Sequence, residues 1–169
     1  MNSRHSLAFA SAIILAALST PVTAATVRPV DIPERVKGAD RMVVGRVADI
    51  KTSVVRNEFG DVFIVSETVL TVEETLKGQP SALVVIDIPG GTYGGFTQKW
   101  SSLPEVRRGE RAVFFMKKNA SGRYEPHLRG QGILELDDND NVRGSSLNLG
   151  MIRSMARQAA QETPAPQGQ

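Results

Sequence analysis

The stretch from Pro89 to Trp100 has the residue types best suited to binding chemistry. Two glycine pairs flank a tyrosine, and the single tryptophan of the chain follows seven residues later. Glycine lets a backbone approach a ligand closely, and aromatic side chains stack on sugars or hold peptides. We therefore predict a ligand-binding loop made by Gly90, Gly91, Tyr93, Gly94, Gly95, Phe96 and Trp100. The alternative is a mobile or tightly turned loop whose aromatic side chains cap the mouth of a barrel.

Several catalytic and cofactor-binding patterns are absent from the sequence. The glycines of this stretch match neither the P-loop nor the G-x-G-x-x-G motif, so they do not favour phosphate binding. There is no G-x-S-x-G elbow and no HExxH, and His127 is the only histidine after His5. The chain has no cysteine, which excludes disulfides and thiolate chemistry. We predict no catalytic residue, no metal site and no cofactor.

Acidic residues offer the second source of chemistry. Glu73 and Glu74 are adjacent in an expected strand, so their side chains point to opposite faces and cannot form a carboxylate pair. Asp137, Asn139 and Asn141 alternate as in a calcium-binding loop, but the glycine and the glutamate that such a loop needs downstream are missing. We predict a hairpin turn there, with a weak calcium site as the alternative.

Basic residues are concentrated between Lys99 and Arg129, although the formal net charge of the chain is only +2. Near-neutral charge argues against nucleic acid as a partner. The concentration has two interpretations, a solvated strand face or a patch for an anionic surface or partner. The candidate patch comprises Arg107, Arg108, Arg111, Lys117 and Lys118.

The first residues are typical of a signal peptide. Arg4 precedes an apolar run from Leu7 to Leu18, and small residues around Ala24 suit signal peptidase. We predict a signal peptide over 1–24, one β-rich domain over 25–161 and a disordered tail over 162–169. The mature protein would be periplasmic or secreted, with no transmembrane segment; an uncleaved N-terminal anchor is the alternative.

The rest of the pattern predicts mainly strands between two helices. A short helix should begin near Asp31 and end at Gly38, and a helix capped near Asn148 should close the domain. We expect strands over Met42–Val55, Val62–Leu76, Leu83–Ile88, Ala112–Met116 and one or two within Tyr124–Leu136. The third of these is short and apolar, which is typical of a central strand. Gly45 should mark a bulge or bend in the first strand.

These elements predict a mainly β fold. Long, bent early strands suit a small, five- to six-stranded, OB-like barrel, and a twisted antiparallel sheet packed by the last helix is the alternative. Both versions carry a short N-terminal helix and a C-terminal helix.

The motif order resembles a family of small, functionally uncharacterised, exported bacterial proteins. It runs VVGRV, TVEETLKG, PGG with a second glycine pair, GERAVFFM and GQGILELD, over roughly Val43 to Asp137. More distantly, the layout resembles the OB-like barrel of the netrin and tissue inhibitor of metalloproteinases domains. That resemblance implies binding rather than catalysis. The animal inhibitors chelate zinc through an N-terminal cysteine, which this chain lacks, so their mechanism does not carry over.

Taken together, these observations predict a non-catalytic binding or accessory domain of the cell envelope. Its partner would be a protein or glycan of the envelope, held by the glycine-rich aromatic loop. Two other classes stay open: an enzyme, such as a hydrolase that uses carboxylates brought together by folding, and a structural protein that binds an anionic surface.

Overall fold

The computed structural model describes residues 30–56 and 59–162 of the chain. Its elements, in chain order, are α1 (Ile32–Gly38), β1 (Arg41–Arg56), β2 (Val62–Lys77), β3 (Leu83–Pro89), β4 (Gly91–Tyr93), β5 (Phe96–Gln98), β6 (Arg111–Lys118), β7 (Tyr124–Pro126), a 3-10 turn (Arg129–Gly132), β8 (Ile133–Glu135) and α2 (Leu149–Gln161). The predicted signal peptide and most of the predicted tail lie outside the described residues.

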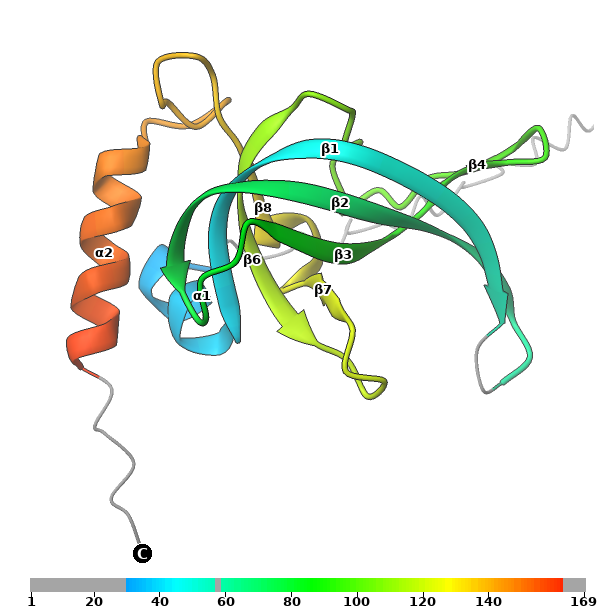
Figure 1. Cartoon of the computed structure of the whole chain (residues 1–169), viewed down its shortest axis with the longest axis horizontal. Helices are drawn as coiled ribbons and strands as arrows, with labels where there is room; N and C mark the ends of the chain where they lie inside the picture. The colour runs from blue at the N-terminus through cyan, green and yellow to red at the C-terminus, as the bar shows by residue number, and fades with distance from the viewer. Residues whose placement is uncertain (1–29, 57–58, 163–169) are drawn as a thin grey trace, which may run out of the picture.

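The main sheet closes into a ring. Its strand order is β1-β2-β3-β7-β6-β8, and β1 also pairs with β6, so the sheet returns to its first strand. All these pairings are antiparallel except β3 with β7, which meet in parallel through Ile86 and Tyr124. The mainly β fold class, with a helix at each end of the domain, is confirmed (Figure 1).

A bulge at Gly45 bends β1 as it passes between β2 and β6. The pairing of β1 with β2 shifts register between Val44 and Gly45, as the sequence predicts. A Cβ at Gly45 would lie 3.1 Å from the carbonyl oxygen of Thr71, closer than side chains normally approach backbone. Glycine therefore suits this position because β2 passes so close.

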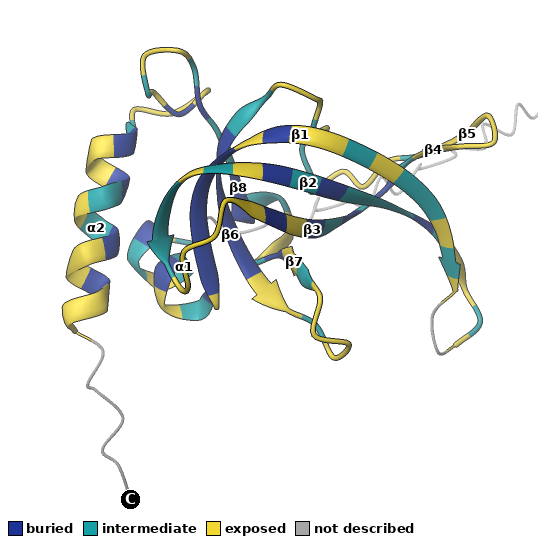
Figure 2. Cartoon of the chain, viewed as in Figure 1, coloured by how far each residue is buried: buried dark blue, intermediate teal, exposed yellow. Residues whose placement is uncertain are grey.

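Two hydrophobic clusters occupy the two faces of β1 and β6. One fills the ring interior and includes Val43, Leu70 and Phe114. The other lies between the ring and the two helices and includes Phe115 and Ile152. Because neighbouring residues of a strand point to opposite faces, β6 and the first part of β1 are buried on both sides (Figure 2).

The prediction that Leu83–Ile88 is a central strand is only partly right. β3 has β2 on one side, but its pairing with β7 is limited to Ile86. Its burial alternates along the strand, and Leu83 and Val85 remain exposed. The short apolar run suggests a strand buried on both faces. The strand that is buried on both faces is β6, not β3.

Both terminal helices begin where the sequence predicts. Asn148 caps α2 through its Oδ1 atom, which accepts a hydrogen bond of 2.9 Å from the amide of Met151. Asp31 is the N-cap residue of α1 but makes no side-chain capping bond there, although the spacing of Asp31 and Glu34 matches that of a capping box. At the other end of α1, the ammonium of Lys77 on β2 donates to the carbonyls of Val36, Lys37 and Ala39.

Candidate binding site

The predicted glycine-rich loop is a hairpin of two short strands. Tyr93 pairs with Phe96 across Gly94 and Gly95, whose φ angles are +56° and +83°. A two-residue turn with positive φ at both central positions matches the twist of the flanking strands, and glycine adopts it without strain. The hydroxyls of Thr92 and Thr97 are 2.8 Å apart across the hairpin. The segment is therefore an ordered projection from the ring (Figure 1).

The base of the hairpin is held against β2 by three hydrogen bonds. The amide of Gly90 donates to the carbonyl of Ile64, and the amide of Ile64 donates to Oε1 of Gln98, each over 2.7 Å. The hydroxyl of Ser66 donates to the carbonyl of Gly90, also over 2.7 Å. A Cβ at Gly91, whose φ is +129°, would lie 2.4 Å from Oγ of Ser66. Glycine thus permits this close approach of the hairpin to the sheet.

A cavity of about 290 Å³ lies between the hairpin base, the sheet and the loop that follows the hairpin. Its walls combine apolar groups with hydroxyl and amide groups and with the indole of Trp100. The lining includes Ile50, Ser66, Thr68, Ile88, Gly90, Gly91, Thr92, Thr97, Gln98, Lys99, Trp100, Leu103 and Glu105. Such a mixture of an aromatic wall with a few polar groups is typical of small-ligand sites.

Trp100 contributes to two cavities. It also lines a smaller one, of about 250 Å³, together with Pro126 and Arg129. The guanidinium carbon of Arg129 lies 5.8 Å from the centre of the indole, within the range of a cation–π interaction. Arg129 and the preceding Leu128 both have left-handed backbone, with φ of +54° and +57°. Consecutive strained residues of this kind persist where surrounding structure fixes them, and they often lie near functional sites.

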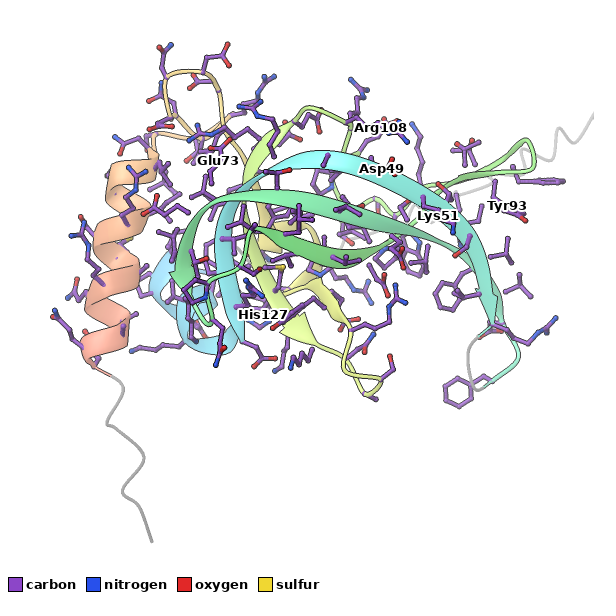
Figure 3. All side chains as sticks on the ribbon, viewed as in Figure 1. Asp49, Lys51, Glu73, Tyr93, Arg108 and His127 are labelled. Carbon is purple, nitrogen blue, oxygen red and sulfur yellow. The ribbon has the colours of Figure 1, made fainter. Side chains whose placement is uncertain are left out.

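The structure divides the predicted ligand-binding residues into two groups. Gly90, Gly91 and Trp100 line the cavity. The others, Tyr93, Gly94, Gly95 and Phe96, form the hairpin tip, where Tyr93 is 50% and Phe96 79% exposed. Figure 3 shows Tyr93 on the outer part of the hairpin, well away from the ring. The tip can therefore contact only a ligand that extends beyond the cavity.

β2 supplies this cavity with polar residues that are not among the predicted site residues. Ser66 and Thr68 both line it, and the side chain of Thr68 is fully buried. The hydroxyl of Thr68 donates to the carbonyl of Ser66 over a long 3.3 Å. The alternation Ile64, Ser66, Thr68, Leu70 along one strand face was the available signal, because small polar residues on a core-facing row mark a place where the core opens.

The predicted basic patch does not form one surface. Arg111 and Lys117 lie near opposite ends of β6, six residues apart, which is roughly 20 Å along a strand. Lys118 lies at the Lys117 end, where its ammonium is 5.6 Å from the centre of the Tyr124 ring. Arg107 and Arg108 lie in the turn before β6, at the Arg111 end.

Carboxylates already engage the arginines at that end of β6. Arg108 forms an ion pair with Asp49 (Figure 3), and Arg107 lies 3.5 Å from Glu105. Arg111 donates to both Glu73 and Asp140 over 2.5 Å. These bonds, that to Glu73 above all, raise the pKa of Arg111. The patch is therefore partly neutralised by the fold itself.

Acidic pairs are likewise bridged by arginines. Glu67 and Asp87 face each other on β2 and β3, and both accept hydrogen bonds from Arg123, over 2.5 to 2.6 Å. Glu73 and Glu74 point apart as predicted: Glu73 binds Arg111, whereas Glu74 binds Arg153. Glu105 is the only carboxylate among the described residues that line the Trp100 cavity.

The remaining titratable candidates have structural surroundings. His127 lies against α1, since a Cβ at Gly38 would be 2.4 Å from its Nε2 atom. Burial, followed by the charge of Lys117, lowers the pKa of His127, which favours the neutral imidazole. Asp137 accepts the amides of Asn139 and Asn141 within its own turn, and the bonds from Asn141 lower its pKa. Within residues 30–56 and 59–162, no cluster of three His, Asp or Glu is placed to hold a metal ion.

No family model and no curated protein matches the chain in comparisons with known proteins. Among the described residues, no helix has the length and apolar character needed to cross a membrane. The assignment of a function therefore depends on the geometry of the Trp100 cavity and the hairpin beside it.

Proposed function

We propose that this protein is a non-catalytic binding domain of the cell envelope, and that its ligand is a glycan or a glycan-bearing partner held at the β4–β5 hairpin. One observation carries the proposal: the Trp100 cavity joins an indole wall to hydroxyl and amide groups at the base of the hairpin. Aromatic faces stack on the apolar faces of sugar rings, while hydroxyls and amides bond to sugar hydroxyls.

The size of the cavity suits a small part of a ligand, such as one sugar ring. Its volume of about 290 Å³ lies at the lower end of the range for ligand pockets. One sugar ring suits that space better than an extended oligosaccharide. The rest of the ligand would run outward along the hairpin, where Tyr93 and Phe96 offer further aromatic surface. A polymer of the envelope, or a protein that carries such a glycan, has this form.

Two features favour binding over hydrolysis at this site. A carboxylate-based hydrolase needs two acids facing the same bound group. Of the described residues that line the cavity, only Glu105 carries a carboxylate, and it also lies 3.6 Å from Lys99 and 3.5 Å from Arg107. Glu67 and Asp87 do come together elsewhere, but Arg123 occupies the space between them.

The cellular location is part of the same proposal. The sequence of residues 1–24 is typical of a signal peptide, which would deliver the domain to the periplasm or beyond the cell. Envelope glycans and their protein partners are available there.

Intrinsic fluorescence gives a direct test, because Trp100 is the only tryptophan of the chain. The purified protein would be titrated with a panel of disaccharides and soluble envelope-glycan fragments. A ligand that stacks on the indole should change the intensity or wavelength of emission with saturation. Calorimetry would then report the affinity of wild type, Trp100→Ala and Thr97→Val, the last of which removes an exposed hydroxyl that lines the cavity while keeping the shape of the side chain.

Phe59→Ala provides the matched control, because Phe59 is an exposed aromatic residue that does not line the cavity. We expect binding at least tenfold weaker in Trp100→Ala, clearly weaker in Thr97→Val, and unchanged in Phe59→Ala. Equal affinity in Trp100→Ala and wild type would rule out the cavity as the site. If no member of the panel binds, the glycan proposal fails.

A further inference from the structure

Arg41 is a buried cation without a carboxylate partner among the described residues. Arg41 is the first residue of β1 and is only 9% exposed. The described arginines that form ion pairs are exposed or half-buried and contact Asp or Glu, as Arg111 and Arg123 do. A buried charge is costly unless it is paired, so this exception calls for an explanation.

The hydrogen bonds of Arg41 are also incomplete. Its Nη2 atom donates to the hydroxyl of Ser81 over 2.8 Å, and that hydroxyl donates to the carbonyl of Leu83 over 2.6 Å. Its Nε atom is buried and has no partner. The guanidinium carbon lies 5.9 Å from the centre of the Tyr124 ring, which provides attraction but no acceptor. Buried polar groups left unpaired in this way are rare in folded proteins.

Arg41 lines an open hollow of about 500 Å³ with Leu83, Val85, Arg123 and Tyr124. This hollow shares no lining residue with the Trp100 cavity. On β2, Ser66 and Thr68 line the cavity, whereas Glu67 lines the hollow. Since alternate residues of a strand point to opposite faces, the two depressions lie on opposite faces of the sheet.

The hollow combines one unpaired cation with exposed aliphatic surface. Leu83 is 58% and Val85 43% exposed, and both lie on β3. Guanidinium groups match carboxylates in geometry as well as charge. A ligand that suits both features carries a carboxylate next to aliphatic side chains, which describes the C-terminus of an apolar peptide.

The edge of β3 favours a peptide over other carboxylates. β7 reaches β3 only at Ile86, so Leu83, Val84 and Val85 have no strand paired on that side among the described residues. An extended peptide can add to such an edge through main-chain hydrogen bonds, with its terminal carboxylate held by a cation. We propose that this hollow binds the C-terminal carboxylate of an apolar, extended peptide, with Arg41 as the anion-binding residue. The proposal is independent of the glycan site.

The probe is a synthetic hexapeptide that ends in Val-Val-Leu with a free carboxylate, compared with the same peptide as its C-terminal amide. Nitrogen-15 NMR titration of the purified protein reports both affinity and location. We expect the acid to bind at least tenfold more tightly than the amide. The shifted amides should include those of Leu83, Val85 and Tyr124, and exclude those of the β4–β5 hairpin.

Two variant pairs test the assignment. Arg41→Met should abolish the preference for the acid, whereas Arg46→Met removes an equal charge from the same strand and should preserve it. Because Arg41→Met removes a buried side chain, Leu83→Asp gives a second test on an exposed residue. It should weaken binding of the acid at least tenfold, while Val62→Asp adds the same charge at an exposed position outside the hollow and should not.

Three outcomes would overturn the inference: binding of acid and amide with equal affinity, no binding of either peptide, or shifts confined to residues outside the hollow. Retention of the acid preference in a folded Arg41→Met protein would remove Arg41 from the site.

Discussion

The β1–β2 ribbon has two halves that share the same pair of strands and differ in almost every other respect. In the first half of β1, residues 42–46 pair with β6 as well as with β2, and nearly every residue is buried. In the second half, from Asp49 onward, β1 keeps only β2 as its partner in the main sheet, and its residues are half-buried or exposed. Figure 2 shows the change of burial along the ribbon.

This difference separates stability from binding. Buried apolar surface concentrates in the ring and under the helices, so that part holds the fold together. The β4–β5 hairpin leans on the ribbon at its base and presents Phe96 to solvent. Segments with few buried contacts open most readily and are the ones that binding can remodel. We therefore expect substitutions of the buried apolar residues of the ring to affect mainly unfolding, and substitutions of exposed hairpin residues to affect ligand binding with little effect on unfolding.

The largest predicted effect contrasts two phenylalanines. Phe114 is fully buried inside the ring, and Phe114→Ala should lower the free energy of unfolding by about 3–5 kcal/mol through the cavity it leaves. Phe96→Ala, at the exposed hairpin tip, should change it by less than about 0.5 kcal/mol. Urea denaturation followed by circular dichroism measures both. Similar losses in the two variants would show that the hairpin is part of the cooperative core.

The second prediction compares two glycines of the hairpin. At Gly91, φ is +129° and an added Cβ would meet Oγ of Ser66, so Gly91→Ala should cost about 1–3 kcal/mol and disturb the Trp100 cavity. At Gly94, φ is +56° and an added Cβ meets nothing within 4 Å. Gly94→Ala therefore carries only backbone strain, about 1–2 kcal/mol. Tryptophan emission should shift in Gly91→Ala and stay unchanged in Gly94→Ala; the reverse would contradict the proposed anchoring of the hairpin base.

The third prediction concerns the C-terminal end of α1, where Lys77 of β2 donates hydrogen bonds to the last carbonyls. Lys77→Met removes an ammonium that serves three carbonyls at the end of α1, and should cost about 1–2 kcal/mol. Lys51→Met, at an exposed position of the distal ribbon, serves as control and should be neutral within about 0.5 kcal/mol. Equal denaturation midpoints for the two variants would mean that the ammonium does not hold the helix.

Local patterns in the sequence were sufficient to predict most elements of the ring. Apolar runs and turn residues located the long strands, and Gly45 indicated the bulge that the register shift confirms. Asn148 indicated the start of α2, where its side chain caps the helix. These features depend on residues close to one another in the chain, so they can be predicted from a single sequence.

Long-range pairing could not be predicted in the same way. Nothing in the sequence near Leu83 indicates that β7 pairs with β3 at only one residue. Nor does it indicate that the hydroxyl of Ser81 accepts a hydrogen bond from Arg41, which lies 40 residues away in the chain. The candidate site shows the same limit: Gly90, Gly91 and Trp100 were predicted from their types, whereas Thr68 reaches the cavity only because β2 crosses beneath the hairpin. Those contacts follow from closure of the ring.

The smallest predicted effect is a pH dependence of the free energy of unfolding, caused by His127 in the ring. Burial against α1 lowers the pKa of His127 below its ordinary value of 6.5. The unfolded chain therefore binds this proton more readily than the folded one below pH 6.5. The contribution of His127 to stability is complete above that pH and is lost as pH falls toward the lower folded-state pKa.

Urea midpoints between pH 7.5 and 5 should decline for wild type and stay nearly flat for His127→Asn, which keeps a polar planar group without this titration. Asp137 and Glu162 also have lowered pKa values, but their ordinary values of 3.8 and 4.5 place their loss at more acidic pH. The difference between wild type and His127→Asn over this range therefore isolates the histidine. A wild-type midpoint that rises on acidification would show that protonated His127 is better accommodated by the fold than the neutral ring, and would contradict the packing of its imidazole against Gly38.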